Sequence, residues 1–305
     1  MTAQNTNDRL CGALIGLAIG DAVGTTVEFM PRGSFAPVTD MTGGGPFELK
    51  AGQWTDDTSM ALCLAASLAE CQAFSSMDQM ERYLNWFKKG YMSCTGSSFD
   101  IGMTVSAAIW RFGVTGNPKA GSTDPETAGN GSLMRLAPVP IFYFPDMGKA
   151  EFFAGESSKI THGTAECLDA CRLFARMLCR AFAGGSKEEI LLADAANFHG
   201  SSKIEAIARG EYTQKTENNI FGTGYVVACL EAALWCFHTT DSFEAAVLKA
   251  ANLGDDADTT AAVCGQIAGA YYGQSGIPPR WIAKLAMLDT IQDLARQLIY
   301  HSPKD

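Results

Sequence analysis

The sequence is poor in charge and lacks the common nucleotide-binding motifs. Only 18% of its 305 residues are charged, whereas 47% are hydrophobic. P-loops, dinucleotide fingerprints and recognisable Ser/His/Asp nucleophile strings are absent. The net charge of −10 argues against a nucleic-acid backbone or an anionic membrane as the main partner. This composition predicts a compact globular protein with much buried helix surface.

Cysteine is present, but without the spacing of a metal or disulfide framework. There are ten cysteines and no Cys-x-x-Cys pair, which argues against a structural zinc site. Because most of the cysteines stand in apolar runs, we expect buried, reduced thiols and a cytoplasmic protein. The cysteines in apolar runs are Cys63, Cys167, Cys171, Cys179, Cys229, Cys236 and Cys264.

The N-terminal region shows no signal-peptide pattern. Residues 1–9 are polar, and we expect them to form a flexible N-terminus. The apolar run over residues 10–20 is too short and too rich in glycine to span a bilayer. Its glycines, Gly12, Gly16 and Gly20, recur at every fourth position. On a helix they would line one face and allow another backbone to approach closely.

Few segments alternate with a period of two, which favours an all-α fold. No low-complexity linker or change of composition divides the chain, so residues 1–305 are expected to form a single domain. Long loops rich in Gly and Pro are predicted at 31–53 and 113–132, and loops of that length are often functional. The expected helices cover residues 10–20, 58–71, 80–89, 104–112, 133–141, 150–158, 165–183, 186–195, 224–237, 242–250, 259–272 and 279–300.

Two acidic clusters precede helical segments. Residues 254–260 read Gly-Asp-Asp-Ala-Asp-Thr-Thr, and residues 54–58 read Trp-Thr-Asp-Asp-Thr. The simplest interpretation is helix capping, because Asp and Thr oxygens satisfy free backbone N–H groups and offset the macrodipole. Three neighbouring carboxylates also repel one another, however, which suggests a bound cation. Carboxylate and hydroxyl oxygens suit Mg²⁺ or Mn²⁺ rather than Zn²⁺, and the two clusters together could hold two ions.

Three further segments allow both a functional and a structural interpretation. Residues 129–132, Gly-Asn-Gly-Ser, could cradle a phosphate with backbone N–H groups or form a plain helix-entry turn. His162 stands before a helix, as a local hydrogen-bonding residue or as a catalyst. Residues 221–225, Phe-Gly-Thr-Gly-Tyr, could offer an aromatic platform for a base or pack in the core.

Taken in order, these motifs resemble the ADP-ribosylglycohydrolases. That family includes the dinitrogenase reductase-activating glycohydrolase and the ADP-ribosylarginine and ADP-ribosylserine hydrolases. The resemblance covers residues 11–273. Its motifs are Gly-Asp-Ala at 20–22 with Glu28 downstream, Trp-Thr-Asp-Asp-Thr at 54–58, Phe-Asp-Ile-Gly at 99–102, Gly-Asn-Gly-Ser-Leu-Met-Arg at 129–135, Thr-His at 161–162, Gly-Tyr-Val at 224–226 and Gly-Asp-Asp-Ala-Asp-Thr at 254–259.

The resemblance implies a fold and a site. The fold would be an all-α orthogonal helical bundle with two divalent ions, Mg²⁺ or Mn²⁺, in a central cleft. The implied metal ligands are Thr55, Asp56, Asp57, Asp256, Asp258 and Thr259. The implied catalytic residues are Glu28, Asp57, Asp100 and Asp256, and the implied substrate-binding residues are Asp100, Asn130, Gly131, Ser132, His162 and Tyr225. Asp255 stands where many members have glycine, and we do not expect it to be a ligand.

Two of the implied residues carry a more specific role. Glu28 would lie on or near a mobile loop and help to gate or orient the attacking water. Asp100 would pair with a guanidinium group near the scissile bond, because a buried carboxylate suits that planar cation. The structural alternative is that Asp100 caps the helix that begins near Gly102.

The resemblance also implies an activity. The protein would remove ADP-ribose from a modified protein, with arginine-linked ADP-ribose favoured, by means of a metal-activated water. The alternatives are hydrolysis of serine- or nucleic-acid-linked ADP-ribose, action on another nucleotide-like glycoside or phosphoester, and a non-catalytic ADP-ribose-binding or structural role. We expect a monomer.

Overall fold

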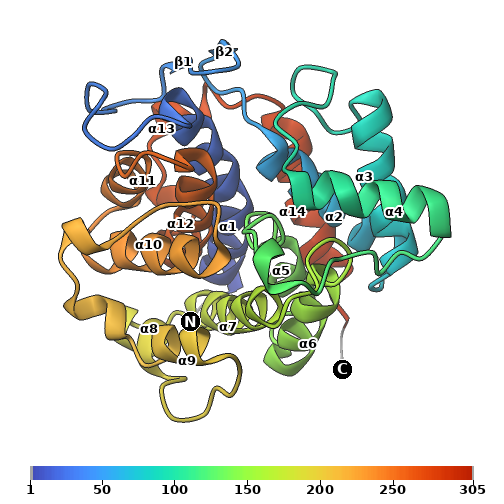
Figure 1. Cartoon of the computed structure of the whole chain (residues 1–305). Coiled ribbons are helices and arrows are strands. Elements are labelled where there is room, and N and C mark those ends of the chain that lie inside the picture. The colour runs from blue at the N-terminus through green and yellow to red at the C-terminus, as the bar shows by residue number, and fades with distance from the viewer. Residues whose placement is uncertain (1–2, 304–305) are drawn as a thin grey trace.

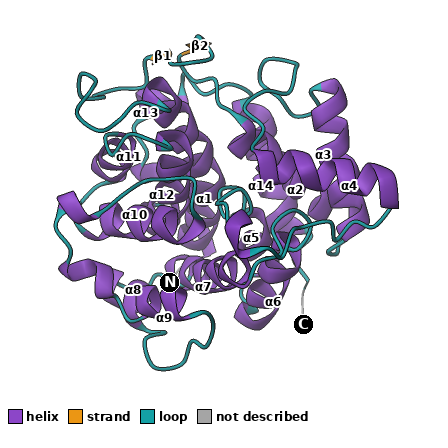
Figure 2. Cartoon of the chain, in the orientation of Figure 1, coloured by secondary structure: helices purple, strands orange, loops and turns teal. Residues whose placement is uncertain are grey.

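The structure is a computed structural model that describes residues 3–303, and helices make up most of it (Figure 1, Figure 2). The α-helices are α1 (Ala3–Gly24), α2 (Asp56–Cys71), α3 (Ser76–Lys89), α4 (Met103–Thr115), α5 (Pro138–Tyr143), α6 (Met147–Ser158), α7 (Ala165–Phe182), α8 (Lys187–Leu192), α9 (Ser202–Ala208), α10 (Val226–His238), α11 (Phe243–Ala251), α12 (Ala257–Tyr272), α13 (Pro279–Ile282) and α14 (Leu288–Tyr300). Short 3₁₀ helices are η1 (Thr25–Val27), η2 (Pro125–Thr127), η3 (Glu211–Gln214), η4 (Glu217–Asn219) and η5 (Gln274–Gly276).

The prediction of an all-α fold is confirmed. In the described part of the chain the only sheet is a pair of two-residue strands, β1 (Gly43–Gly44) and β2 (Leu49–Lys50), within the first long loop. They pair antiparallel, with Gly43 opposite Lys50 and Gly44 opposite Leu49. This hairpin lies at the edge of the molecule, away from the packed helices (Figure 2).

Helices α1 and α12 pack against each other at the centre of the molecule (Figure 1). A Cβ atom added at Gly16 would lie 2.2 Å from the carbonyl oxygen of Gly265, and one added at Gly20 would lie 2.1 Å from that of Ala261. The approach is reciprocal, because a Cβ at Gly265 would lie 2.0 Å from the carbonyl oxygen of Gly16. The close backbone approach predicted from the glycine spacing is thereby confirmed.

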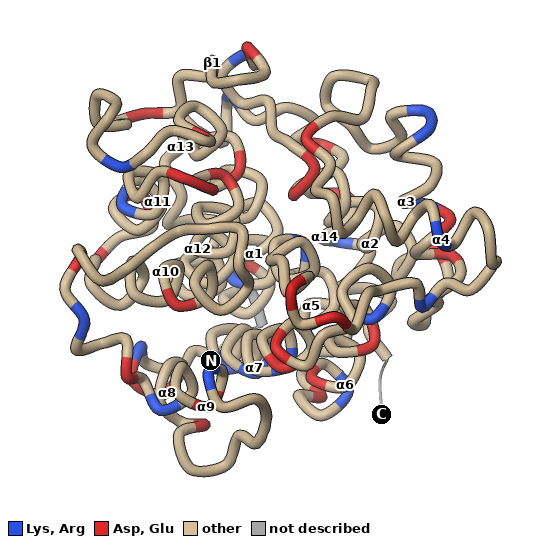
Figure 3. The backbone as a smooth tube through the Cα atoms, viewed as in Figure 1, with Lys and Arg blue, Asp and Glu red and all other residues tan. Residues whose placement is uncertain are grey.

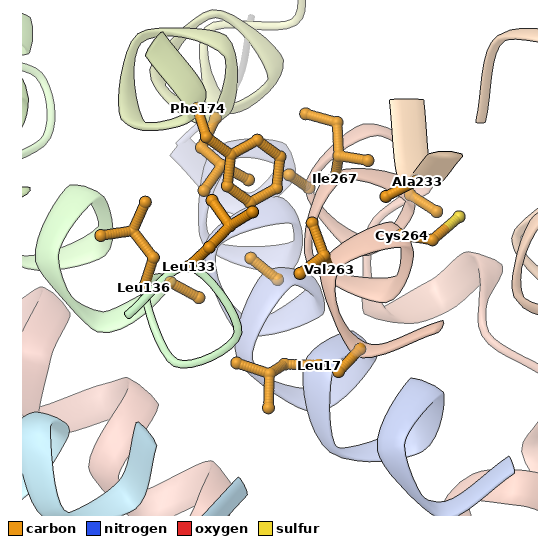
Figure 4. Packing of buried hydrophobic residues seen from close by; sticks show 14 of the residues in the cluster. Leu17, Leu133, Leu136, Phe174, Ala233, Val263, Cys264 and Ile267 are labelled. Atoms are coloured by element: carbon orange, nitrogen blue, oxygen red, sulfur yellow. The ribbon is translucent and has the colours of Figure 1, made fainter. Parts of the chain in front are cut away.

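The remaining helices surround this pair and bury a large apolar core. Leu17 of α1, Phe174 of α7 and Ile267 of α12 meet in its interior together with Leu133 and Leu136 (Figure 4). A second cluster joins α2, α3 and α4 through Met60, Trp86 and Ile109. All seven cysteines predicted to be buried are buried.

The first helix is longer than its sequence predicts. It begins at Ala3, so residues 3–9, expected to be flexible, are helical, while residues 1 and 2 lie outside the described residues. The apolar run expected over residues 10–20 is by itself too short to span a bilayer. The apolar stretch in the structure is longer, Asn5–Val27, and by length and composition alone it could cross a membrane. Inside the protein, however, 89% of that apolar stretch is buried, which identifies α1 as a core helix.

Three other helix predictions were wrong: one helix was missed, one begins later than expected, and one is split in two. Helix α9 was not predicted at all. The segment expected to be helical from residue 133 forms turns until Pro138, because proline suits the first helical turn and not the interior. The single helix expected over 279–300 is split at Met287, whose φ of 54° is left-handed. Ala286 is held there by bonds to loop residues, since its N–H donates to Gly52 O at 2.9 Å.

Basic residues are distributed over many elements of the fold. Figure 3 shows Lys and Arg scattered along the outer helices and loops in this view. Since the Lys and Arg residues do not gather in one place in this view, the acidic clusters say more about the location of a functional site.

Candidate active site

The structure brings the two acidic clusters together. Thr55, Asp56 and Asp57 stand at the N-terminus of α2, and Asp256 and Asp258 stand at the N-terminus of α12. These two helix ends meet although their residues lie about 200 positions apart along the chain.

Direct contacts join the clusters. The Oγ1 atom of Thr55 lies 3.2 Å from Oδ2 of Asp258. The hydroxyl of Thr259 lies 3.3 Å from Oδ2 of Asp57. The six oxygen-bearing residues that the resemblance singles out as metal ligands therefore come from two adjoining helix ends.

Helix capping does not explain the clusters. Neither Thr55 nor Asp256, the N-cap residues of α2 and α12, makes a side-chain capping bond, so the prediction of such bonds was wrong for both helices, although acidic residues do stand in the first turn of each. The carboxylate of Asp21, on α1, performs this role for α2 instead. Its Oδ1 accepts the Thr55 N–H at 2.8 Å, and its Oδ2 accepts the Thr58 N–H at 3.0 Å and the Thr58 hydroxyl at 2.6 Å.

Asp21 is a site residue that sequence reasoning missed. It is fully buried and fixes the orientation of the α2 N-terminus from another helix. The motif Gly-Asp-Ala at 20–22 was the available signal, but nothing in it indicates a partner more than thirty residues away. By satisfying the amides of Thr55 and Thr58, Asp21 leaves the carboxylates of Asp56 and Asp57 free for other contacts.

Carboxylates converge in the cleft that opens above these helix ends. Oxygen atoms of Glu28, Asp100 and Asp258 all lie within 4.8 Å of one another. Deeper in, Oδ1 of Asp57 and Oδ1 of Asp258 are buried and have no hydrogen-bond partner among the described residues. Buried carboxylate oxygens without a donor are costly unless a cation or a proton compensates them.

The electrostatics of the cluster agree with this geometry. Burial, followed by repulsion from Asp100, raises the pKa of Glu28 to about 10. Burial, followed by repulsion from Asp21, raises the pKa of Asp100 to about 7. Burial and neighbouring carboxylates also raise the pKa values of Asp57 and Asp258 well above the usual range. Without a cation, this set of acids resists full ionisation.

Asp100 faces the cleft and does not cap the next helix. Helix α4 has Gly102 as its N-cap residue and no side-chain capping bond, so that structural alternative was wrong. Asp100 adopts a left-handed φ of 59°, which is uncommon for a residue other than glycine. Such strained positions cluster at functional sites, and here the strain places a carboxylate beside Glu28.

The segment that carries Glu28 is fastened to the turn before α12. The N–H of Phe29 donates to Asp255 O at 2.7 Å, and the N–H of Asp255 donates to Met30 O at 2.8 Å. Both Phe29 and Asp255 have left-handed φ values, 63° and 55°. Asp255 lines the cleft but does not belong to the close carboxylate group around Glu28.

The opposite wall of the cleft is a glycine-rich loop. Asn130 donates from Nδ2 to Oδ2 of Asp256 at 2.6 Å, and its backbone N–H donates to Gly224 O at 3.0 Å. A Cβ at Gly131 would lie 2.8 Å from Cε1 of His162, so the ring lies against the bare backbone. The loop does not open a regular helix, because α5 starts only at Pro138.

The cleft has a volume of about 860 Å³. The predicted site residues among those that line it are Glu28, Asp56, Asp100, Asn130, Gly131, His162, Asp256, Asp258 and Thr259. Thr55 and Asp57 lie buried beneath them.

Two predicted substrate-binding residues lie outside the cleft lining. Ser132 is buried, and its hydroxyl accepts a hydrogen bond from Ser158 Oγ at 2.8 Å. Tyr225 lines an adjacent cavity of about 480 Å³ with Glu166 and Lys203. Its hydroxyl donates to Oε2 of Glu166 at 2.5 Å and accepts from Nζ of Lys203 at 2.7 Å. A substrate would meet Tyr225 only if it extended past the glycine-rich loop.

The fold and the cleft define a class of protein: an all-α enzyme whose acidic, oxygen-rich cleft lies at the N-termini of two helices. The sequence model of the ADP-ribosylglycohydrolase family matches residues 2–304, and the chain belongs to this family.

Relatives with more specific names span nearly the whole chain. The chain is 44% identical to ADP-ribosylarginine hydrolase Tri1 of Pseudomonas putida (strain GB-1), an alignment that covers 100% of this chain and 81% of that protein. It is 33% identical to ADP-ribosyl-[dinitrogen reductase] glycohydrolase of Rhodospirillum rubrum, over 94% of this chain and 93% of that protein. A solved ADP-ribosylglycohydrolase-related protein complex matches with a TM-score of 0.85 and 40% identity, over 98% of this chain and 100% of that chain.

Proposed function

We propose that the protein hydrolyses the N-glycosidic bond that joins ADP-ribose to an arginine side chain of a modified protein. The observation that carries this proposal is the convergence of the two acidic helix ends with Glu28 and Asp100 in one cleft. The relative named ADP-ribosylarginine hydrolase, at 44% identity, supports the arginine linkage. The relative named for ADP-ribosylated dinitrogen reductase supports a protein as the modified substrate.

The cleft fits two divalent cations, Mg²⁺ or Mn²⁺. Its donors are carboxylate and hydroxyl oxygens, which these hard cations prefer, and two of the carboxylate oxygens are buried and have no partner within residues 3–303. When bound, such cations would neutralise the carboxylates, polarise the ribose hydroxyls and make a water more acidic. The residues that would hold them are Thr55, Asp56, Asp57, Asp256, Asp258 and Thr259.

The other residues of the cleft would bind and orient the substrate. Glu28 would hold the attacking water by a carboxylate oxygen, and Asp100 would pair with the guanidinium of the leaving arginine. The backbone of Asn130 and Gly131 would face the diphosphate and ribose. Glycoside cleavage develops positive charge on the sugar. The carboxylates of Glu28 and Asp100, which are not among the residues that would hold the cations, would stabilise that charge in the transition state more than in the bound substrate.

The activity test compares release of ADP-ribose from arginine-, serine- and nucleic-acid-linked substrates. We expect release from the arginine linkage, and its loss on treatment with a chelator. Asp57→Asn should lower the rate by about 100-fold or more, since charge stabilisation of this kind typically contributes that much. Asp289→Asn, which changes an exposed acid on α14, is the matched control and should leave the rate unchanged.

The role of Asp100 has its own comparison. Asp100→Asn should slow the arginine-linked reaction, because an amide cannot form the charged pair with guanidinium. Full activity of Asp100→Asn on the arginine linkage would remove the argument for guanidinium recognition.

Binding of ADP-ribose without release from any linkage would favour a non-catalytic member of the family. Activity on a phosphodiester substrate would favour a different hydrolase.

A further inference from the structure

A short chain of polar atoms runs beneath the glycine-rich wall of the cleft. Arg135 donates from Nη2 to the hydroxyl oxygen of Thr161 at 2.7 Å. The same hydroxyl lies 2.8 Å from Nδ1 of His162. Arg135 and Thr161 are fully buried, and His162 is 2% exposed, so water does not compete for these bonds.

The donors and acceptors in this chain fix where each proton lies. A guanidinium has only donors, so the Thr161 oxygen must accept from Arg135. The Thr161 oxygen has a second lone pair that could accept from an Nδ1–H, but the buried Thr161 proton would then have no acceptor. A donated bond from the Thr161 hydroxyl to Nδ1 of His162 satisfies all of these groups. Elsewhere in the described residues, the Thr161 hydroxyl has no acceptor within hydrogen-bond distance. Nδ1 is therefore an acceptor, and a neutral imidazole with an unprotonated Nδ1 carries its proton on Nε2.

The Nε2 atom of His162 lies at the cleft. The imidazole is packed against the loop so closely that a Cβ at Gly129 would lie 3.3 Å from Nε2, and one at Gly131 would lie 3.2 Å from it. His162 lines the cleft together with these two glycines. Within residues 3–303, Nε2 makes no hydrogen bond. An N–H group that faces the cleft and has no acceptor among the described residues is available to a ligand oxygen.

Arg135 has an unusual environment for a cation. Its guanidinium stacks over the Tyr83 ring, 4.6 Å from the centroid, and donates from Nη1 to Gly131 O at 2.9 Å. No carboxylate of the described chain forms an ion pair with it. The uncompensated positive charge opposes protonation of the nearby imidazole. Burial and this guanidinium lower the pKa of His162 to about 3, in agreement with a neutral ring.

We propose that Arg135 and Thr161 are positioning residues that hold His162 as a neutral Nε2–H donor toward an oxygen of the ADP-ribosyl group. The ligand class rests on the proposed function, whereas the tautomer follows from the geometry alone. In this arrangement His162 binds the substrate through its Nε2–H group and neither gains nor loses a proton during the reaction. The oxygen it would meet belongs to the diphosphate or to a ribose hydroxyl.

The first experiment determines the tautomer by ¹⁵N NMR of the histidine rings. The chain has four histidines, and the His162→Gln spectrum assigns the signal. We expect Nδ1 unprotonated and Nε2 protonated in the wild-type protein, and loss of this single tautomer in Thr161→Val. Thr161→Ser, which retains a hydroxyl, should restore it. A protonated Nδ1 in the wild type, or an unchanged ring signal in Thr161→Val, would overturn the proposal.

The second experiment measures ADP-ribose affinity by calorimetry. Thr161→Val should weaken binding about ten-fold, as expected for one neutral hydrogen bond. In a His162→Gln background the same substitution should have no further effect, because Thr161 acts through the imidazole. An equal loss of affinity in the wild-type and His162→Gln backgrounds would show that Thr161 does not act through the imidazole. Thr240→Val is the matched control, since it removes a hydroxyl that bonds Cys236 O at 2.7 Å outside the cleft lining.

The two hypotheses fail in different ways. If the wild-type protein does not bind ADP-ribose while the NMR result is as expected, the proposed function is wrong, but Arg135 and Thr161 still fix the tautomer of His162. If ADP-ribose binds and Thr161→Val leaves both the tautomer and the affinity unchanged, the positioning role of Thr161 is wrong and the proposed function is unaffected. Arg135→Lys adds an independent check, because one donor to Thr161 remains possible and the tautomer should persist.

Discussion

A single buried carboxylate orders one half of the candidate site. Asp21 contributes nothing to the wall of the cleft, yet it accepts four hydrogen bonds from the first turn of α2. Two of the donors are backbone N–H groups that a helix N-terminus cannot satisfy internally. The position of Asp56 and Asp57 therefore depends on a residue of α1, and on its bonding capacity rather than on its charge alone.

At this scale we expect Asp21→Asn to lower stability and activity together. The amide retains only one acceptor oxygen, and its NH₂ group faces the donors of Thr55 and Thr58, so buried N–H and O–H groups lose their partners. The expected loss is about 2–4 kcal/mol in the free energy of unfolding, measured by denaturant titration. Asp289→Asn on the exposed face of α14 is the control, and stability equal to wild type in Asp21→Asn would contradict the assignment.

At the scale of elements, the contact between α1 and α12 positions both halves of the cleft. The glycines of α1 allow the backbones to touch, and the same two helices carry Asp21 and Asp258 at adjoining ends. The α2 cluster is attached to α1 through Asp21, and the α12 cluster is attached by this glycine contact. A small change in the spacing of the two helices would move the two sets of oxygens apart.

Alanine substitutions of two helical glycines separate this effect from helix propensity. Gly16→Ala would place a Cβ 2.2 Å from Gly265 O, so the helices must separate, and we expect a loss of about 1–3 kcal/mol or more. In Gly113→Ala, on α4, the new Cβ meets nothing within 4 Å, and a gain of about 0.5–1 kcal/mol is expected. Thermal unfolding measures both, and a gain in Gly16→Ala would exclude the tight contact.

Some of this organisation could be predicted from the sequence and some could not. The glycine spacing predicted the close helix contact, because its cause is local and repeats at every fourth residue. The repulsion among the carboxylates of residues 254–258 predicted a cation site for a similarly local reason, and that site stays a prediction. The capping of α2 by Asp21 depends on a tertiary contact that no spacing reveals.

The predicted helix boundaries were wrong for the same physical reason, namely contacts with distant residues. Met287 breaks the last predicted helix where Ala286 is bound on both sides by a distant loop, since Trp54 also donates from Nε1 to Ala286 O at 3.2 Å. Contacts of this kind override local propensity. The bonding of Ser132 to Ser158 is a further example, because the motif placed Ser132 in the cleft and the fold turned its hydroxyl inward.

At the scale of the whole molecule, the acidic site is a local weakness of an otherwise well-packed protein. Six carboxylates with raised pKa values lie in the cleft or directly beneath it, namely those of Glu28, Asp56, Asp57, Asp100, Asp256 and Asp258. Their burial and mutual repulsion oppose folding, whereas the helices around them favour it. A ligand that neutralises the cluster should therefore raise the stability of the entire fold.

We expect Mg²⁺ or Mn²⁺ to raise the Tm and a chelator to lower it. At a cation concentration 100 times the Kd, binding to the native state alone would add about 2.7 kcal/mol. Differential scanning calorimetry across a metal titration measures the shift, and Asp256→Asn should reduce it. Identical Tm values with chelator and with saturating Mn²⁺ would count against a cation site in this cleft, whatever the enzymatic activity.

The pairing of α1 with α12 also has a consequence for synthesis on the ribosome. Helix α1 is apolar over most of its length and finds its main partner only when residues 257–272 have emerged. At ordinary elongation rates this takes roughly 10–50 seconds, a period in which this long apolar helix lacks its main partner. We expect nascent chains to engage chaperones through this helix, and the cleft to form only as translation ends.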